Sequence, residues 1–240
     1  MFQNKRDMPR VGIAGLQKTT LLDYPGKIAA TVFMGGCNFR CPFCHNASFV
    51  LNAGKTENIP EEAFFQFLAE RRGLLDGVCV SGGEPLLQNE ISGFLSRIKD
   101  LGFLVKLDTN GSFPLKLREL VDGGLVDYVA MDIKNSPAGY AKTAGTAAGI
   151  LPAVSESVGF LLADPVEYEF RTTVVKDFHN VEDFHAIGKW IRGAKRYFLQ
   201  HFADSGDLIR PGLCGVEKAE LEAFADIVRE YVPSVQIRGI

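Results

Sequence analysis

The sequence lacks any long apolar run. Its 240 residues contain no stretch approaching the ~20 apolar residues that a membrane-spanning helix needs. Residues 1–10 are polar and show no apolar signal core. A Ser/Gly-rich linker, a low-complexity run and a block of like charge are absent too. These absences argue against a membrane protein, and they give no internal point at which to divide the chain into separate domains.

An excess of basic residues is also missing. The chain has 26 Lys and Arg against 29 Asp and Glu, so its formal net charge is −3. Proteins that bind nucleic acid non-specifically need clustered positive charge. We therefore expect no nucleic-acid partner. The hydrophobic content of 46% is ordinary for a globular protein and is ample for a core.

Cysteines are scarce outside one short stretch. Only Cys79 and Cys214 stand apart from the other three. Cys79 lies in an apolar run and is expected to be a packed thiol, whereas Cys214 lies between Gly212-Leu213 and Gly215 and can be exposed. This pattern excludes a disulfide framework and a second iron–sulfur cluster, and it favours a reducing, cytoplasmic setting.

The remaining three cysteines lie in a loop-forming stretch, residues 35–46. Cys37, Cys41 and Cys44 follow a C-x3-C-x2-C spacing, and glycine and proline within the same stretch favour a tight loop. Three thiolates so close in sequence can converge on one metal centre. Thiolate ligands select zinc or an iron–sulfur cluster.

The number of cysteines leaves alternatives open. A four-iron cluster usually takes four cysteines, so three would leave one iron free to bind a substrate or cofactor. A closed zinc site would need a fourth ligand, and His45 is the nearest candidate. Chain neighbours such as Cys44 and His45 rarely reach the same ion, so the spacing favours the open iron–sulfur cluster. Packed thiols without a metal are the third alternative.

Apolar runs and helical periodicities alternate along the rest of the chain. Near-continuous apolar runs predict six buried strands at residues 28–34, 77–81, 103–107, 127–133, 168–175 and 195–202. Apolar periodicity predicts helices near residues 60–73, 91–102, 115–121, 151–162, 184–191 and 216–232, and a strand-like piece follows at 235–237. Residues 135–149 are expected to form a loop. Six strand–helix units favour a mostly parallel sheet, either a partial barrel or a doubly wound sheet.

Unusual polar residues follow each predicted strand. In parallel α/β folds, functional sites lie at the carboxyl ends of the strands. The cysteine stretch follows the first strand, and a Gly-Gly-Glu-Pro turn at residues 82–85 follows the second. Asp132 and Lys134 alternate with apolar neighbours on the fourth strand, so they point to one face. Buried charges of this kind are expensive unless they pair with each other, pair with Arg171, or serve a ligand.

These motifs resemble a known family. The C-x3-C-x2-C spacing, with an aromatic residue before the last cysteine, resembles the signature of radical S-adenosylmethionine (SAM) enzymes. The run Cys-Pro-Phe-Cys-His-Asn at residues 41–46 is similar to that of the activating enzymes of glycyl-radical enzymes. Together with residues 15–27, it most resembles the activating proteins of anaerobic ribonucleoside-triphosphate reductase. The resemblance implies one radical SAM domain over residues 1–240, built as a (β/α)6 partial TIM barrel. It would have an N-terminal extension (about 1–27), a core (about 28–205) and a C-terminal helix and strand (about 206–240).

The resemblance also implies a cofactor set and the residues that hold it. A [4Fe-4S] cluster would be bound by Cys37, Cys41 and Cys44. The SAM molecule would be contacted at its amino group by the Gly82, Gly83 and Glu84 turn and at its adenine by Phe43. Asp108, Thr109 and Asp132 match positions that help to hold a monovalent cation near the SAM carboxylate. Lys134, Arg171 and His201 match other cofactor contacts, although the sequence leaves open whether Gln200 or His201 faces the cofactor. No catalytic residue is implied beyond the cluster and the cofactor.

The implied reaction is the generation of a glycyl radical on a partner enzyme. Reductive cleavage of SAM would give a 5′-deoxyadenosyl radical, with flavodoxin or ferredoxin as the electron donor and anaerobic ribonucleotide reductase as the partner. One alternative keeps the cofactors but activates another glycyl-radical enzyme or acts on a small molecule. An alternative of another class is a zinc-binding interaction protein. That alternative would leave the polar turn at 82–85, Asp108 and Asp132 unexplained.

Overall fold

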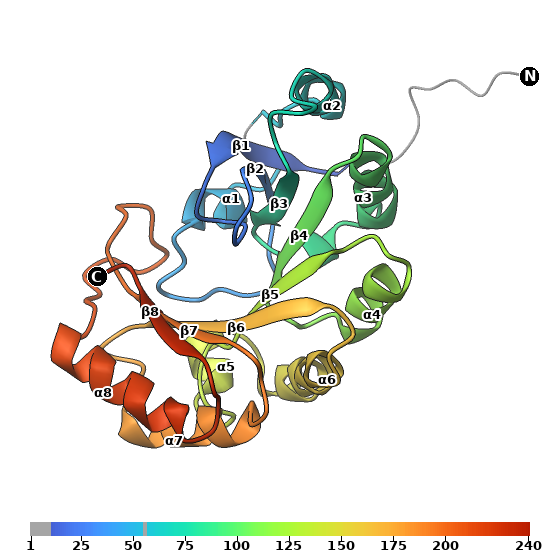
Figure 1. The fold of residues 1–240 in the computed structure, drawn as a ribbon. Helices are drawn as coiled ribbons and strands as arrows, with labels where there is room; N and C mark the ends of the chain where they lie inside the picture. Colours follow the sequence, from blue (N-terminus) through green and yellow to red (C-terminus); the bar gives the residue numbers. More distant parts are fainter. Residues whose placement is uncertain (1–10, 55–56) are drawn as a thin grey trace, which may run out of the picture.

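The computed structural model of the chain describes residues 11–54 and 57–240, and the polar residues 1–10 discussed above lie outside this range. The described residues form one sheet of eight strands, whose order in space follows their order in sequence (Figure 1). The strands are β1 (Ile13–Thr20), β2 (Ala29–Met34), β3 (Gly77–Gly82), β4 (Leu104–Thr109), β5 (Tyr128–Asp132), β6 (Glu167–Val174), β7 (Tyr197–His201) and β8 (Val235–Arg238).

Strands β2 to β8 run parallel to one another. Their apolar runs explain this arrangement, because strands that are covered on one face by helices and on the other by the barrel interior are buried throughout. In β2, for example, five of the six residues are buried. The six predicted strands and the strand-like piece at 235–237 are confirmed, with boundaries shifted by a few residues.

Helices cover the outer face of the curved sheet (Figure 1). The helices are α1 (Ala47–Leu51), α2 (Glu61–Ala69), α3 (Ile91–Asp100), α4 (Pro114–Asp122), α5 (Tyr140–Ala144), α6 (Leu151–Leu162), α7 (Val181–Trp190) and α8 (Lys218–Arg229), with short 3-10 helices η1 (Pro85–Leu87) and η2 (Ala148–Ile150). In α3, the buried residues Ile91, Phe94, Leu95 and Ile98 fall at the i, i+3, i+4, i+7 positions that predicted the helix.

The sheet does not close, since β1 and β8 stand at its two ends. The fold is therefore a single-domain α/β partial barrel, which confirms the expected fold class. Strand β1, the short helices α1 and α5, and the 3-10 helices η1 and η2 were not predicted. Strand β1 is antiparallel to β2 and lies within the expected N-terminal extension, and α5 lies within the expected loop at 135–149.

The interior of the barrel is polar at the end opposite the cysteines as well. Glu169 on β6 is completely buried, and both of its oxygens accept hydrogen bonds from Arg238 on β8, at 2.8 and 3.0 Å. The hydroxyl of Tyr128 on β5 donates a third, at 2.9 Å. A buried carboxylate is tolerated when it is paired in this way. Strand β8 therefore supplies the cation that neutralises a charge on β6.

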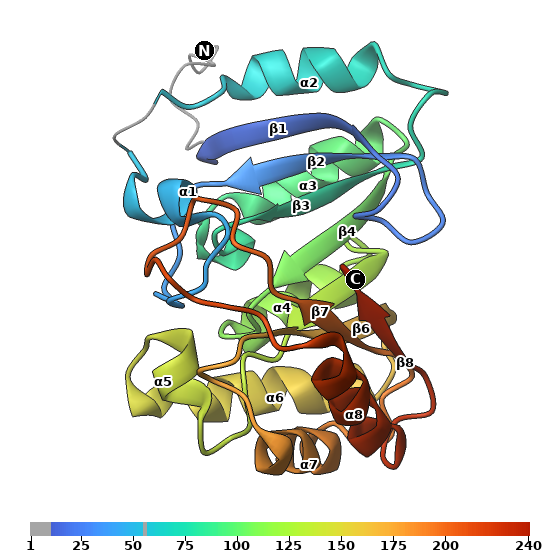
Figure 2. The same cartoon turned by 90° about the vertical axis from the view of Figure 1, so that its left-hand side faces the viewer.

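The carboxyl ends of the parallel strands meet at one edge of the molecule. Figure 2 shows the short helices α1 and α5 at this edge, together with the orange-red segment that connects β7 to α8. The polar motifs found in the sequence all lie at this edge. No helix within the described ranges is long and apolar enough to cross a membrane.

Candidate functional site

The three clustered cysteines line one cavity of about 350 Å³ at the carboxyl ends of the strands. They stand on the loop between β2 and α1. The amide of Phe39 donates to the Cys37 sulfur at 3.3 Å, and the Cys41 thiol lies 3.5 Å from the carbonyl of Ala144. Cys41 is buried, whereas Cys37 and Cys44 are partly exposed to the cavity. All five cysteines of the chain are free thiols.

Two opposing effects act on these thiols. Burial raises the pKa of Cys37 to about 11 and that of Cys41 to about 12, and it raises the pKa of Cys44 as well. The ammonium of Lys134 lies close enough to lower all three pKa values in part. Since metals bind the thiolate form, Lys134 favours metal binding at all three positions.

His45 lines the cavity, but its ring is already engaged by neighbours other than the cysteines. Its ring stacks on Phe202 at a centroid distance of 5.2 Å, and its Nε2 donates to the carbonyl of Ala203 at 2.9 Å. Within the described ranges, no group of three His, Cys, Asp or Glu side chains converges as a single metal ion would require. A four-iron cluster attaches each thiolate to a different iron, so it does not need the thiols to converge on one point.

The Gly82 and Gly83 turn owes its glycines to close packing against the start of the cysteine loop. A Cβ on Gly82 would lie 2.3 Å from the Met34 amide nitrogen, and one on Gly83 would lie 1.8 Å from the Gly36 carbonyl oxygen. Gly82 also has a φ of 114°, which favours glycine. Both glycines line the cavity. The turn therefore fixes the end of β3 against the cysteine loop and leaves room for a ligand beside it.

Glu84 is completely buried behind this turn and does not line the cavity. Its carboxylate accepts hydrogen bonds from Thr109 Oγ1 at 2.8 Å, from the Asn110 amide at 2.7 Å and from the Leu86 amide at 3.1 Å. These contacts join the loops after β3 and β4. Glu84 therefore holds the walls of the cavity together from a position behind its lining.

The free energy of unfolding is expected to depend on the titration of Glu84. Burial raises its pKa to about 7, although its three donors oppose the shift. Because the folded protein then binds the proton more tightly than the unfolded chain, stability falls as the pH rises from about 4.5 to about 7. The Glu84→Gln side chain cannot titrate. The unfolding free energy of the wild type, relative to that of the variant, should therefore fall by up to about 3 kcal/mol as the pH rises over this range. Urea unfolding at several pH values measures it, and parallel pH profiles for the two proteins would contradict it.

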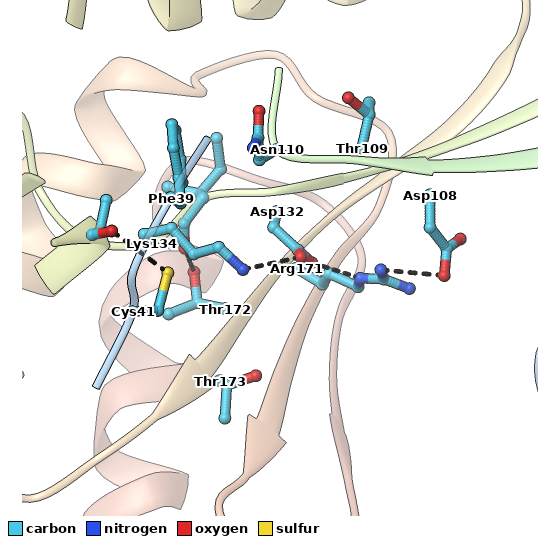
Figure 3. A network of polar contacts seen from close by, with 12 residues as sticks. Phe39, Cys41, Asp108, Thr109, Asn110, Asp132, Lys134, Arg171, Thr172 and Thr173 are labelled. Atoms are coloured by element: carbon cyan, nitrogen blue, oxygen red, sulfur yellow. Dashed lines mark hydrogen bonds and ion pairs between the residues drawn. The ribbon is translucent and has the colours of Figure 1, made fainter. Parts of the chain in front are cut away.

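An alternating chain of charges crosses the cavity wall. The Arg171 guanidinium lies between Asp132 and Asp108, bonding to Asp132 through Nε and to Asp108 at 3.1 Å through Nη2 (Figure 3). Lys134 donates to the other oxygen of Asp132 at 2.8 Å. The alternation seen in the sequence placed Asp132 and Lys134 on one face correctly. They pair with each other and with Arg171 while also lining the cavity.

Lys106 on β4 is the last member of this charge network. Its side chain is almost fully buried in the barrel interior, and its ammonium bonds to the second partner of Arg171, Asp108. Sequence reasoning missed Lys106, although it stands two residues before Asp108 on β4 and so shares its face. Burial alone would raise the carboxyl pKa values of Asp108 and Asp132. Arg171 and the lysines outweigh this effect and hold both pKa values below their usual range.

Two further predicted residues lie at the cavity as expected from the sequence. Phe43 lines it, and its ring packs edge-on against Phe178 and His179 at centroid distances of 5.6 and 6.4 Å. Thr109 also lines it, with its hydroxyl engaged by Glu84. Asp23, which lines the cavity from the loop between β1 and β2, was not singled out from the sequence.

Two histidines lie elsewhere than expected. His201 is not among the residues lining the cavity, because its ring turns outward and Nε2 donates to the Val216 carbonyl at 3.0 Å. Gln200 lines the cavity instead. His179 stands near the polar start of a predicted helix, where the sequence predicts a solvated side chain. It is buried instead, with Nδ1 3.1 Å from the Val175 amide and Nε2 2.9 Å from the Lys134 carbonyl. Burial lowers its pKa, so the ring is neutral and fixes the backbone beside Lys134.

The cavity brings together all of the thirteen candidate residues except Glu84 and His201. Its donor set fits an iron–sulfur cluster with an open iron: three thiols from one loop, with a lysine ammonium beside them and no fourth cysteine among the described lining residues. The volume lies within the usual range for small-molecule sites. The mixed charges of Asp132, Lys134 and Arg171 suit a ligand that carries both an amino group and a carboxylate.

Comparison with known sequences points to the same chemistry. Residues 31–146 match the Radical SAM superfamily. A protein of Methanocaldococcus jannaschii named as a glycyl-radical enzyme activating enzyme is 32% identical over 236 residues, which span 95% of this chain and 96% of the relative. The pyruvate formate-lyase-activating enzyme of Clostridium pasteurianum is 35% identical over 129 residues, 51% of this chain and 52% of the relative.

A solved structure shares the fold. SuiB of Streptococcus suis, in a crystal structure with bound S-adenosylmethionine, superposes with a TM-score of 0.67 at 12% sequence identity. The match covers 85% of this chain and 48% of SuiB. The partial barrel is thus a scaffold that the two proteins have in common, despite their low identity.

Proposed function

Because the chain belongs to the radical SAM superfamily, and within it to the glycyl-radical enzyme activating enzymes, we propose that it activates anaerobic ribonucleotide reductase in the cytoplasm. Membership implies a [4Fe-4S] cluster and SAM. When bound, they supply reductive cleavage of SAM and the radical that removes a hydrogen atom from a glycine of the partner. The electron donor in this proposal is flavodoxin or ferredoxin.

One observation carries the assignment of the site. Cys37, Cys41 and Cys44 line the same cavity as the Gly82 and Gly83 turn and the charge network that ends at Lys134. In the proposal, the three thiolates hold the cluster and Lys134 offsets their negative charge. SAM would then bind in the rest of the same cavity, beside the cluster.

The chain's own residues orient the cofactor in this proposal. Arg171 and Lys134 present cations to the SAM carboxylate, while Asp132 fixes both of them by ion pairs. Phe43 offers an apolar ring for the adenine. Gln200, which lines the cavity, replaces His201 as the contact from β7. Glu84 acts behind the cavity wall by holding the loops.

The expected monovalent cation needs a further condition. Lys106, Arg171 and Lys134 already surround Asp108 and Asp132 with three positive charges against two negative ones. Another cation becomes favourable there only when an anionic group, such as the SAM carboxylate, joins the network. We therefore include this cation only in the SAM-bound state.

The partner assignment rests on residues 15–27, the stretch that resembles the activating proteins of anaerobic ribonucleotide reductase. In the structure this stretch forms most of β1 and the loop that places Asp23 in the cavity. The subfamily motif therefore reaches the site where a partner's glycine would be presented. The relative from Clostridium pasteurianum is named for pyruvate formate-lyase, which makes that enzyme the second candidate partner.

Anaerobic purification followed by metal analysis and EPR spectroscopy tests the cofactor part of the proposal. We expect about four iron and four sulfide per chain and a reduced-cluster signal that changes when SAM is added. One zinc without iron, and no response to SAM, would overturn it.

Incubation of the reduced protein with SAM and each candidate partner tests the partner. We expect a glycyl-radical EPR signal with anaerobic ribonucleotide reductase and none with pyruvate formate-lyase. A signal only with pyruvate formate-lyase would replace the first assignment by the second.

A further inference from the structure

The segment that follows β7, residues 203–210, lies against the cysteine loop, and we call it the strap segment. Figure 2 shows it in orange-red beside α1. Three contacts join the strap segment to the cysteine loop and the start of α1, which lie far earlier in the sequence. These are the Ala203 carbonyl with His45 Nε2 at 2.9 Å, the Asp207 carboxylate with Ser48, and the Arg210 amide with the Pro42 carbonyl at 2.9 Å.

The contact through Asp207 replaces a missing helix cap. Helix α1 begins directly after Asn46, a residue type that usually caps a helix through its own side chain. Here the Asn46 side chain makes no cap and donates instead to the Gly82 carbonyl at 3.0 Å. Both oxygens of Asp207 accept from the Ser48 amide, at 3.1 and 3.2 Å, and one accepts from the Ser48 hydroxyl at 2.7 Å.

The position of Cys44 depends on this arrangement. Cys44 stands two residues before Asn46, so the chain that leaves it is fixed on one side by the Asn46 bond to Gly82 and on the other by the Asp207 bonds to Ser48. His45, directly after Cys44, is fixed by Phe202 and Ala203. The charge of Asp207 disfavours a thiolate at Cys44. Its benefit is therefore the hydrogen bonding and not its charge.

From these contacts we propose that Asp207 is a positioning residue for the cluster: by capping α1 across the strap segment, it holds Cys44 where the cluster needs it. This inference rests on the proposed function. A thiolate held in place rebinds its iron more readily than one on a loosened loop, because less conformational freedom is lost on binding. Asp207 therefore controls how long the cluster is retained.

The rate of iron loss tests this inference. Wild type, Asp207→Ala and Asp207→Asn are reconstituted anaerobically, and the release of iron to a ferrous chelator is followed before any SAM is added. Loss of a helix cap and a charged hydrogen bond corresponds to roughly a tenfold change in an equilibrium constant. We expect Asp207→Ala to release iron about tenfold faster than wild type. Asp207→Asn, which keeps one acceptor oxygen, should fall between them.

Asp204→Ala is the matched control. Asp204 lies in the same segment and loses the same charge, but its carboxylate accepts only the Gly206 amide in the contacts described, at 2.7 Å within the segment itself. We expect it to release iron at the wild-type rate. Thermal unfolding of the iron-free proteins is measured in parallel, and Asp207→Ala should melt only about 2–4 °C below the control, as the loss of one cap predicts. The reduced-cluster EPR signal of Asp207→Ala should broaden, as a loosened ligand would cause.

The outcomes distinguish a failure of the Asp207 role from a failure of the proposed function. Equal iron release from Asp207→Ala and Asp204→Ala, in a protein whose wild type holds four iron, would overturn the role of Asp207 and leave the function standing. A wild type that takes up no iron would instead overturn the proposed function.

Discussion

Replacing Cys41 with serine is expected to abolish cluster binding, with less than one iron per chain after anaerobic reconstitution and at least a ~100-fold loss of SAM cleavage. Loss of a residue that merely supports a metal ligand costs about 10- to 100-fold in metal affinity or activity, so loss of a proposed ligand should exceed that. Serine is a hard, weakly acidic ligand in place of a soft thiolate. Iron analysis and product assays measure both effects.

The fold should survive this change. The Cys41 thiol makes one weak hydrogen bond in the structure, to the Ala144 carbonyl, and a serine hydroxyl of similar size can donate to the same oxygen. Cys214→Ser is the control, because Cys214 is exposed and lies outside the cavity. We expect it to keep its iron and its activity. Full iron content in Cys41→Ser would contradict the assignment of this thiol to the cluster.

Replacing Asp132 with asparagine is expected to have the second largest effect, on both stability and SAM binding. Asp132 is the shared anion of Lys134 and Arg171, and the three side chains are only 15–24% exposed. Breaking a fully buried pair costs about 3–5 kcal/mol, so with this residual exposure we expect a loss of about 2–3 kcal/mol in unfolding free energy. Because Lys134 and Arg171 lose the anion that fixes them, SAM should bind at least about tenfold more weakly. Urea unfolding and equilibrium dialysis measure the two effects.

Asp164→Asn provides a matched control for this substitution. Asp164 also pairs with a lysine, Lys195, but both side chains are about half exposed. Its φ of 62° is a conformation that asparagine adopts readily. We expect no measurable change in stability or SAM binding. An equal loss in Asp132→Asn and Asp164→Asn would mean that the charge network does not stabilise the cavity.

The sequence predicted the elements with strong patterns and missed those with weak ones. Strands β2 to β7 are near-continuous apolar runs, so their composition alone predicts that they are buried. Strand β1 has half-buried, Gly- and Lys-containing residues because it is the antiparallel edge, and this pattern does not distinguish it from a loop. Helix α5 is only five residues long and lies in a stretch rich in glycine and alanine, so it has too few turns for a period to appear.

At the site, residue types were predictable but their partners were not. The cysteine spacing and the alternation of Asp132 with Lys134 are local patterns. Whether Gln200 or His201 faces the cavity depends on how β7 meets the loop before α8, which brings Val216 to the His201 ring. The burial of His179 likewise depends on contacts with Lys134, 45 residues away. Such contacts arise only when the barrel is assembled.

The sequential order of the strands has a consequence for how the protein is made. Each strand pairs with the one translated just before it, so the sheet can grow as the chain leaves the ribosome. Two stabilising contacts form only late, because one of their residues is translated long after the other. Asp207 is translated 159 residues after Ser48, and Arg238 is translated 69 residues after Glu169. The nascent chain therefore carries its three cysteines on a loop that lacks the Asp207 contact through most of translation. We expect iron loading to follow the completion of the barrel and not to guide its folding.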